Sequence, residues 1–80
     1  MIIEIKVFSS LRKGIPPDER HLDGDKWDVE ERATVSQVLE MLNLAGRGDL
    51  ILLVNGHHVN KESVLSEGDA LSILPPIGGG

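Results

Sequence analysis

The sequence predicts an α+β domain in which a mixed β-sheet packs on one helix. Two strand-like segments precede a segment with the periodicity of an amphipathic helix, and further strand-like segments follow it. Glycine and proline separate these segments. A chain of 80 residues forms one domain. Because only one helix is expected, it can cover only one face of the sheet.

The first strands flank a long polar segment. Residues 1–8 alternate between apolar and polar side chains, which predicts a strand with one buried face. Residues 9–25 are polar and are interrupted by glycines and a proline pair, so we expect a long loop. Residues 26–30 alternate again and predict a second strand, antiparallel to the first, with Trp27 in the core.

The helix has the clearest local signal. Thr34 as the N-cap and Gln37 three residues later form a capping box. Apolar residues then recur on one face at the spacing of a helix of about three turns, namely Val35, Val38, Leu39 and Leu42. We expect Gly46 and Gly48 to end the helix.

Residues 50–54 form an apolar run without alternation, so both faces of this strand need cover. One face would pack on the helix, but the sequence does not decide whether the even-numbered or the odd-numbered positions do so. We take Leu52 and Val54 as candidate residues for docking a partner. The alternative is that a loop covers the second face.

The last part of the chain completes the sheet. Asn55 and Gly56 predict a tight hairpin turn, after which Val59 is expected to begin a short strand. Residues 71–74 form the last strand, which ends at a proline pair because proline cannot donate to the ladder. The whole order is that of the β-grasp arrangement, in which the first and last strands lie parallel in the centre of the sheet.

The composition excludes several classes of function. The net charge of −5 argues against binding to nucleic acid. The chain has no cysteine, which excludes disulfides and thiolate chemistry. The longest apolar run, residues 50–54, is too short to cross a membrane, and residues 1–4 lack the start of a signal peptide. We therefore expect a cytoplasmic protein that is a monomer when free.

Other charged and polar groups are weak candidates for a site. His57 and His58 are adjacent on the chain, so they point to opposite faces of a strand and are poorly placed to hold one metal. Arg12 and Lys13 lack the context of a phosphate-binding loop. The acidic residues between positions 18 and 31 are expected to be a solvated face, or to steer the chain toward a basic partner.

The residues after the last strand are the strongest candidate for chemistry. We divide the chain into a β-grasp domain, residues 1–76, and a glycine tail, residues 77–80. Fully extended, residues 75–80 span about 20 Å, and glycine has no Cβ to obstruct passage through a narrow channel. An enzyme could therefore reach the α-carboxylate of Gly80. The alternative is a chain end without function.

Five segments spread over nearly the whole chain carry a family resemblance. They are residues 7–12 (VFSSLR), 33–39 (ATVSQVL), 53–57 (LVNGH), 65–71 (LSEGDAL) and 74–80 (LPPIGGG). Together, in this order and at this length, they resemble the MoaD/ThiS-like sulfur carriers. These are small ubiquitin-like proteins of molybdopterin and thiamine-thiazole biosynthesis.

The resemblance implies a mechanism and a set of site residues. An E1-like enzyme would use ATP to adenylate the carboxylate of Gly80, and sulfur from a persulfide would replace AMP to leave a thiocarboxylate. A sulfur-accepting synthase, such as the large subunit of molybdopterin synthase, would then receive the sulfur. The chain would bind no cofactor and catalyse nothing itself. Gly78 and Gly79 would thread the tail into each partner, while other residues dock, namely Leu74, Pro75, Pro76 and Ile77, with Leu52 and Val54.

Three further possibilities stay open. Within the family, the Leu-Pro-Pro end favours molybdopterin, or a related tungsten cofactor, over the thiamine-thiazole pathway. A ubiquitin-like modifier would instead be conjugated to lysines through Gly80. A plain binding module would make no use of the tail.

Overall fold

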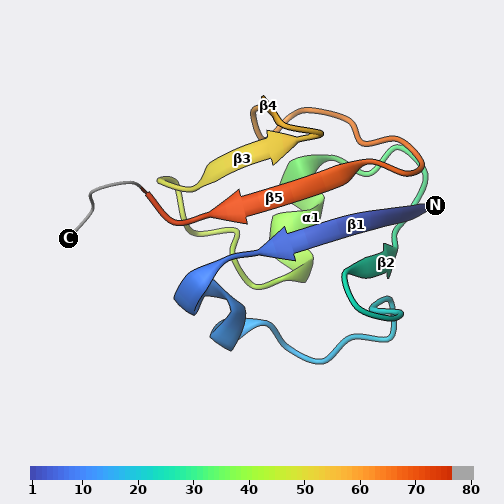
Figure 1. Ribbon diagram of the computed structural model, residues 1–80, viewed down its shortest axis with the longest axis horizontal. Coiled ribbons are helices and arrows are strands. Elements are labelled where there is room, and N and C mark those ends of the chain that lie inside the picture. Colours follow the sequence, from blue (N-terminus) through green and yellow to red (C-terminus); the bar gives the residue numbers. More distant parts are fainter. Residues whose placement is uncertain (77–80) are drawn as a thin grey trace.

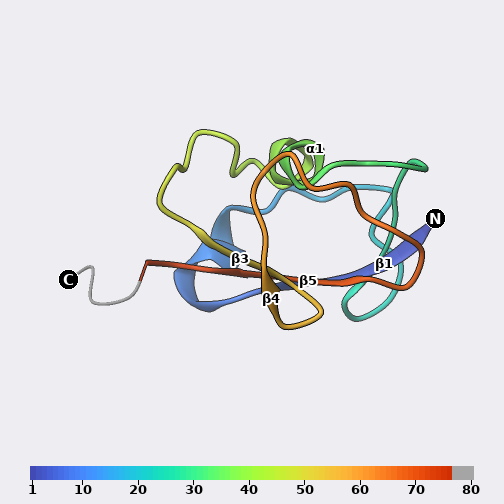
Figure 2. The same ribbon diagram turned by 90° about the horizontal axis from the view of Figure 1, so that it is seen from above.

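The computed structural model describes residues 1–76, which form a mixed sheet with one helix on one face (Figures 1 and 2). The elements in chain order are β1 (Ile2–Val7), the 3₁₀ helix η1 (Ser9–Gly14), β2 (Lys26–Asp28), α1 (Val35–Met41), β3 (Ile51–Val54), β4 (His57–His58) and β5 (Ala70–Leu74). Figure 2 shows the sheet nearly edge-on, with α1 forming the second layer.

The first and last strands pair in the centre of the sheet. The strand order is β2-β1-β5-β3-β4. β1 is parallel to β5, with Val7 opposite Ile73, whereas the other neighbours are antiparallel. This topology confirms the β-grasp arrangement, including the antiparallel pairing of the first two strands.

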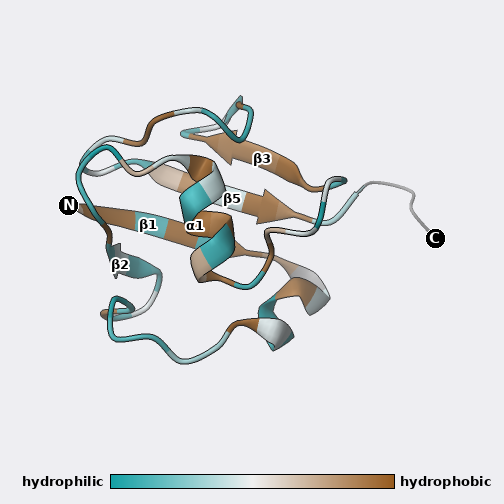
Figure 3. Cartoon of the chain, turned by 180° about the vertical axis from the view of Figure 1, so that it is seen from behind, coloured by the Kyte–Doolittle hydropathy of each residue, from teal (hydrophilic) through white to brown (hydrophobic). Residues whose placement is uncertain are grey.

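The core lies between α1 and one face of the sheet. Alternate residues of the two central strands point into it, namely Ile3, Ile5, Leu71 and Ile73. The predicted apolar stripe of the helix meets them from the other side and is at most 1% exposed. Trp27 is 4% exposed and belongs to this core, as predicted. In Figure 3, hydrophobic residues predominate along β3 and β5, whereas α1 alternates between hydrophilic and hydrophobic residues.

The helix begins as predicted but ends earlier. The Oγ1 atom of Thr34 accepts a hydrogen bond from the Gln37 amide at 3.2 Å, and Oε1 of Gln37 accepts one from the Thr34 amide at 2.8 Å. The helix ends at Met41, so it is shorter than three turns, and Gly46 and Gly48 do not end it. Asn43 takes the left-handed conformation with φ of 63°. This conformation turns the chain, as glycine commonly does after a helix.

Two other predictions need correction. Residues 9–14, expected to be loop, form η1, and its Leu11 is only 4% exposed. Leu11 is the one apolar side chain of this polar segment, and its burial in the core attaches the segment to the domain. The short return strand β4 ends at His58, one residue before the predicted Val59.

A side-chain clamp joins the β3–β4 turn to the turn before β5. Asn55 has φ of 52° and Gly56 has φ of 85°, as the hairpin signal requires. The Asn55 side chain donates to Oδ1 of Asp69 at 3.0 Å and accepts from the Ala70 amide at 3.0 Å. Oδ2 of Asp69 accepts from the Ser66 amide at 2.8 Å. Asn55 therefore supplies both a backbone conformation and two long-range hydrogen bonds.

Substitutions of Asn55 separate these two contributions. Asn55→Gly removes the side-chain hydrogen bonds but tolerates positive φ, and we expect it to lower the free energy of unfolding by about 1–3 kcal/mol. Asn55→Ala adds the cost of a left-handed alanine and should be less stable than Asn55→Gly by about 1 kcal/mol. Urea unfolding monitored by Trp27 fluorescence measures both. Equal stabilities of the two variants would contradict the role of the backbone conformation.

Candidate functional site

The tail leaves the domain at the end of the sheet where β1 also ends. Because β1 and β5 are parallel, the carboxyl ends of both strands lie together, with Val7 opposite Ile73. The predicted docking residues Leu74, Pro75 and Pro76 follow there and are half-buried. The predicted site residues Ile77, Gly78, Gly79 and Gly80 lie outside the described residues. The structure therefore shows where the residues that lead into the tail lie, and we call Leu74, Pro75 and Pro76 the base of the tail.

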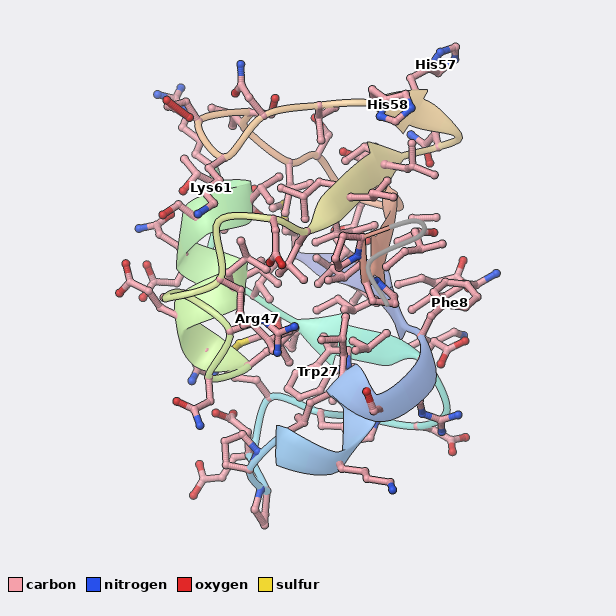
Figure 4. The ribbon with its side chains drawn as sticks, turned by 90° about the vertical axis from the view of Figure 1, so that its left-hand side faces the viewer. Phe8, Trp27, Arg47, His57, His58 and Lys61 are labelled. Atoms are coloured by element: carbon pink, nitrogen blue, oxygen red, sulfur yellow. The ribbon has the colours of Figure 1, made fainter. Side chains whose placement is uncertain are left out.

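An apolar patch surrounds this base on the face of the sheet opposite α1. We call it the outer patch and define it as Phe8, Ile51, Leu53 and Leu74. Leu71 and Ile73 point into the core, so alternation places Leu74 on the outer face. Ile51 pairs with Leu74, and Leu53 pairs with Ser72, which places both β3 residues on that face too. Phe8 is 42% exposed and lies on the side of the sheet away from α1 (Figure 4).

The structure corrects the docking residues predicted in β3. Leu52 is 6% exposed within the core, and Val54 packs against the core. Leu52 is therefore buried, and Val54 is half-buried on the face of the sheet that packs on the helix. Ile51 and Leu53 face outward instead. The apolar run alone does not show which of its residues face outward. Its register against β5 does, because Leu53 pairs with Ser72 on the outer face.

Polar side chains border the outer patch. Lys6, Ser72, Leu53 and His58 form one row across the sheet, as successive partners in the ladder. Lys6 and His58 are exposed at the two ends of this row. An apolar centre with a polar rim is the usual composition of a protein-binding surface. Phe8 was missed as a docking residue because it ends the alternating segment on the side that Glu4 and Lys6 make polar.

The other candidates do not assemble into a site. Within residues 1–76, no group of three histidine, aspartate or glutamate side chains could hold a metal ion. His57 and His58 are both exposed on the hairpin (Figure 4). Arg12 and Lys13 lie at the end of η1. No helix in residues 1–76 is both long and apolar enough to cross a membrane.

The fold and the position of the tail define a small ubiquitin-like protein of the β-grasp type. The model of the ThiS family matches residues 5–80, which include the tail. The chain therefore belongs to the ThiS family, a group of small ubiquitin-like carriers and modifiers. Its sequence is 31% identical to small archaeal modifier protein 3 of Haloferax volcanii, over 100% of both chains.

Solved structures share this fold. The solution structure of the Haloferax volcanii HVO 2177 protein has a TM-score of 0.71 and 28% identity, covering 100% of this chain and 87% of that one. A chain in the complex of subunits 1 and 2 of the molybdopterin-converting factor of Helicobacter pylori has a TM-score of 0.59 and 21% identity, covering 100% of both chains. At this lower identity the likeness concerns the fold alone.

Asp18 and Arg20 form a close ion pair in the segment between η1 and β2. The Arg20 side chain donates to both carboxylate oxygens of Asp18, at 2.8 and 2.6 Å, and the Arg20 amide donates at 2.8 Å. These hydrogen bonds lower the pKa of Asp18 from 3.8 to about 2, mainly through the side chain of Arg20. Any stability from this pair is present above pH 3.8 and is lost as the pH falls through about 2.

The Asp18 carboxyl carbon should therefore titrate near pH 2 in an NMR experiment. In Arg20→Gln we expect its pKa to rise toward 3.8, because the largest stabilising interaction of the charged form is gone. Arg47→Gln, which makes the same change of net charge outside this pair, is the control and should leave the Asp18 titration in place. An unchanged pKa in Arg20→Gln would refute the assignment.

Proposed function

We propose that this chain is a sulfur carrier whose Gly80 carboxylate is adenylated by an E1-like enzyme and converted to a thiocarboxylate. The observation that carries this proposal is the match of the ThiS family model through the glycine tail to residue 80. The tail also begins next to the outer patch, and this position suits a protein that presents its C-terminal residues to a larger partner. Gly78 and Gly79 would thread the tail into the partner's active site.

The chemistry requires activation because a carboxylate is a poor acyl donor. The Gly80 carboxylate attacks the α-phosphorus of ATP, pyrophosphate leaves, and an acyl-adenylate forms. A persulfide then attacks the acyl carbon and displaces AMP. A thiol reduces the resulting acyl disulfide and releases the thiocarboxylate. The chain itself contributes no catalytic group, so the partner supplies the ATP site and the sulfur donor.

For the destination of the sulfur, we favour molybdopterin or a related tungsten cofactor. The support is the Leu74-Pro75-Pro76 end and the shared fold with the Helicobacter pylori complex of molybdopterin-converting factor subunits. In this proposal the synthase partner corresponds to the larger subunit. Delivery to thiamine-thiazole synthesis is the alternative.

A second candidate function is conjugation to lysines through Gly80. It is favoured by the 31% identity over the full length to small archaeal modifier protein 3. Both functions begin with the same acyl-adenylate. They differ in the nucleophile that follows, which is sulfur for a carrier and a lysine amine for a modifier.

The outer patch would dock the activating enzyme. Its four apolar side chains lie on one face, where Phe8 is exposed and the other three are half-buried, and apolar clusters that reach the surface mark interaction surfaces. Leu74 belongs to the patch, and Pro75 and Pro76 continue from it. A partner seated on the patch would therefore lie next to the residues that lead into the tail.

The first prediction concerns the tail. The full chain, incubated with ATP, the host's E1-like enzyme and a sulfur donor, should gain the mass difference between sulfur and oxygen on its C-terminal peptide. A chain lacking Gly79 and Gly80 is the control and should not change. Isopeptide adducts on host lysines, without thiocarboxylate, would favour the modifier. Absence of both the adenylate and the thiocarboxylate would refute the sulfur-carrier proposal.

A charged residue in the outer patch should weaken docking. We expect Leu53→Glu to reduce affinity for the E1-like enzyme at least about tenfold, because a buried apolar contact becomes a desolvated charge. Val64→Glu is the matched control, since Val64 is 59% exposed and is not part of the patch. Calorimetry measures both affinities, and circular dichroism confirms folding. Equal affinities of two folded variants would remove the patch from the proposal.

A further inference from the structure

The edge of β1 away from β5 is only partly covered. β2 pairs with β1 over Ile2, Ile3 and Glu4, and the next hydrogen bond across this edge runs from the Ile5 amide to the Asp25 carbonyl at 2.8 Å. Beyond it, in the described part of the chain, no backbone hydrogen bond joins β1 to residues 15–25. The edge is therefore open near its carboxyl end.

The ladder on the other side shows which groups are left at this open edge. The Phe8 amide donates to the Ile73 carbonyl at 3.1 Å, and Val7 is the residue opposite Ile73. In a parallel ladder, the amide and carbonyl of Val7 then point away from β5, toward the open edge. One donor and one acceptor are thus directed at the space beside β1.

That space is a groove of about 720 Å³ between β1, η1 and residues 15–25. Figure 1 shows the segment after η1 running at a distance from β1 before it returns as β2. The apolar residues Ile5, Val7, Ile15 and Trp27 line the groove, and Phe8 of the outer patch also lines it. His21 is stacked on Trp27 with ring centroids 4.5 Å apart, and its Nε2 lies 2.7 Å from the Gly24 carbonyl oxygen. These contacts fix the position of His21 on the side of the groove opposite η1.

The charge of the groove differs in sign from that of the chain. Lys6 and Arg12 line it against a single acid, Asp25, whereas the chain as a whole carries −5. Lys6 lies on the outer side of the edge, and Arg12 lies on η1. Charge complementarity therefore favours an acidic occupant over a basic one.

We propose that this groove binds an extended acidic segment of a protein partner, which adds to the open edge of β1 as a strand. Main-chain hydrogen bonds to Val7 would hold the segment, as in other cases of strand addition. Alternate side chains of such a segment point to opposite sides. Apolar ones would meet Ile15 and Val7, and acidic ones would meet Lys6 and Arg12. The inference does not depend on the chemistry of the tail.

The test uses a capped octapeptide that alternates glutamate with valine, titrated into the full ¹⁵N-labelled chain. We expect saturable shifts of the Lys6 and Val7 amides and of the Trp27 indole. A version N-methylated at alternate residues should lose saturable binding, because it cannot pair with the edge. A peptide with lysine in place of glutamate should bind at least tenfold more weakly.

Two protein variants complete the test. Arg12→Glu should weaken binding of the glutamate peptide at least fivefold, whereas Lys13→Glu, an equal change in charge outside the groove lining, should change it less than twofold. Three outcomes would overturn the proposal. They are no saturable shift at millimolar peptide, shifts confined to Ile51, Leu53 and Leu74, and equal binding of the N-methylated peptide. Self-association of the free chain through this edge, seen by sedimentation, would assign the groove to a second copy instead.

Discussion

The parallel pairing of β1 with β5 is the constraint on which the rest of the molecule depends. Two parallel strands cannot be joined by a tight turn, so the chain between them must cross over and supply α1 and the flanking strands. The same pairing brings both carboxyl ends to one end of the sheet. Phe8 and Leu74, which are far apart in sequence, become neighbours there. The outer patch and the base of the tail are therefore consequences of topology.

The way in which β1 ends determines the edge beside it. After Phe8 the chain turns into η1 because Leu11 enters the core. This turn carries the next segment away from β1, and β2 returns only far enough to pair with the first residues of the strand. A long hairpin would have paired the whole edge. A short β2 leaves the groove instead, which is tolerable because β1 still has β5 on its other side.

Most of the fold could be predicted from local signals, whereas the site could be predicted only in part. Thr34 and Gln37 fixed the start of the helix, and the alternation in β1 identified its buried face, because each signal acts within a few residues. The end of the helix was missed because Asn43, not glycine, takes the left-handed conformation. The outward face of β3 could not be found locally either. Which β3 residues face outward depends on their pairing with Ser72 and Leu74, which are about twenty residues away in sequence.

The outer face of the sheet is polar in the middle of β1 and apolar near the residues that lead into the tail. A sheet face in water normally carries polar side chains. In the middle of β1 the outer face follows that rule, with Glu4 and Lys6 exposed and Glu4 paired across from Lys26. Toward the end where the tail leaves, Leu74 and Ile51 replace polar residues. These side chains lie opposite the core and add little to its packing. This apolar cluster lies outside the core and beside the residues that lead into the tail, and it is the surface that the proposed docking of a partner would use.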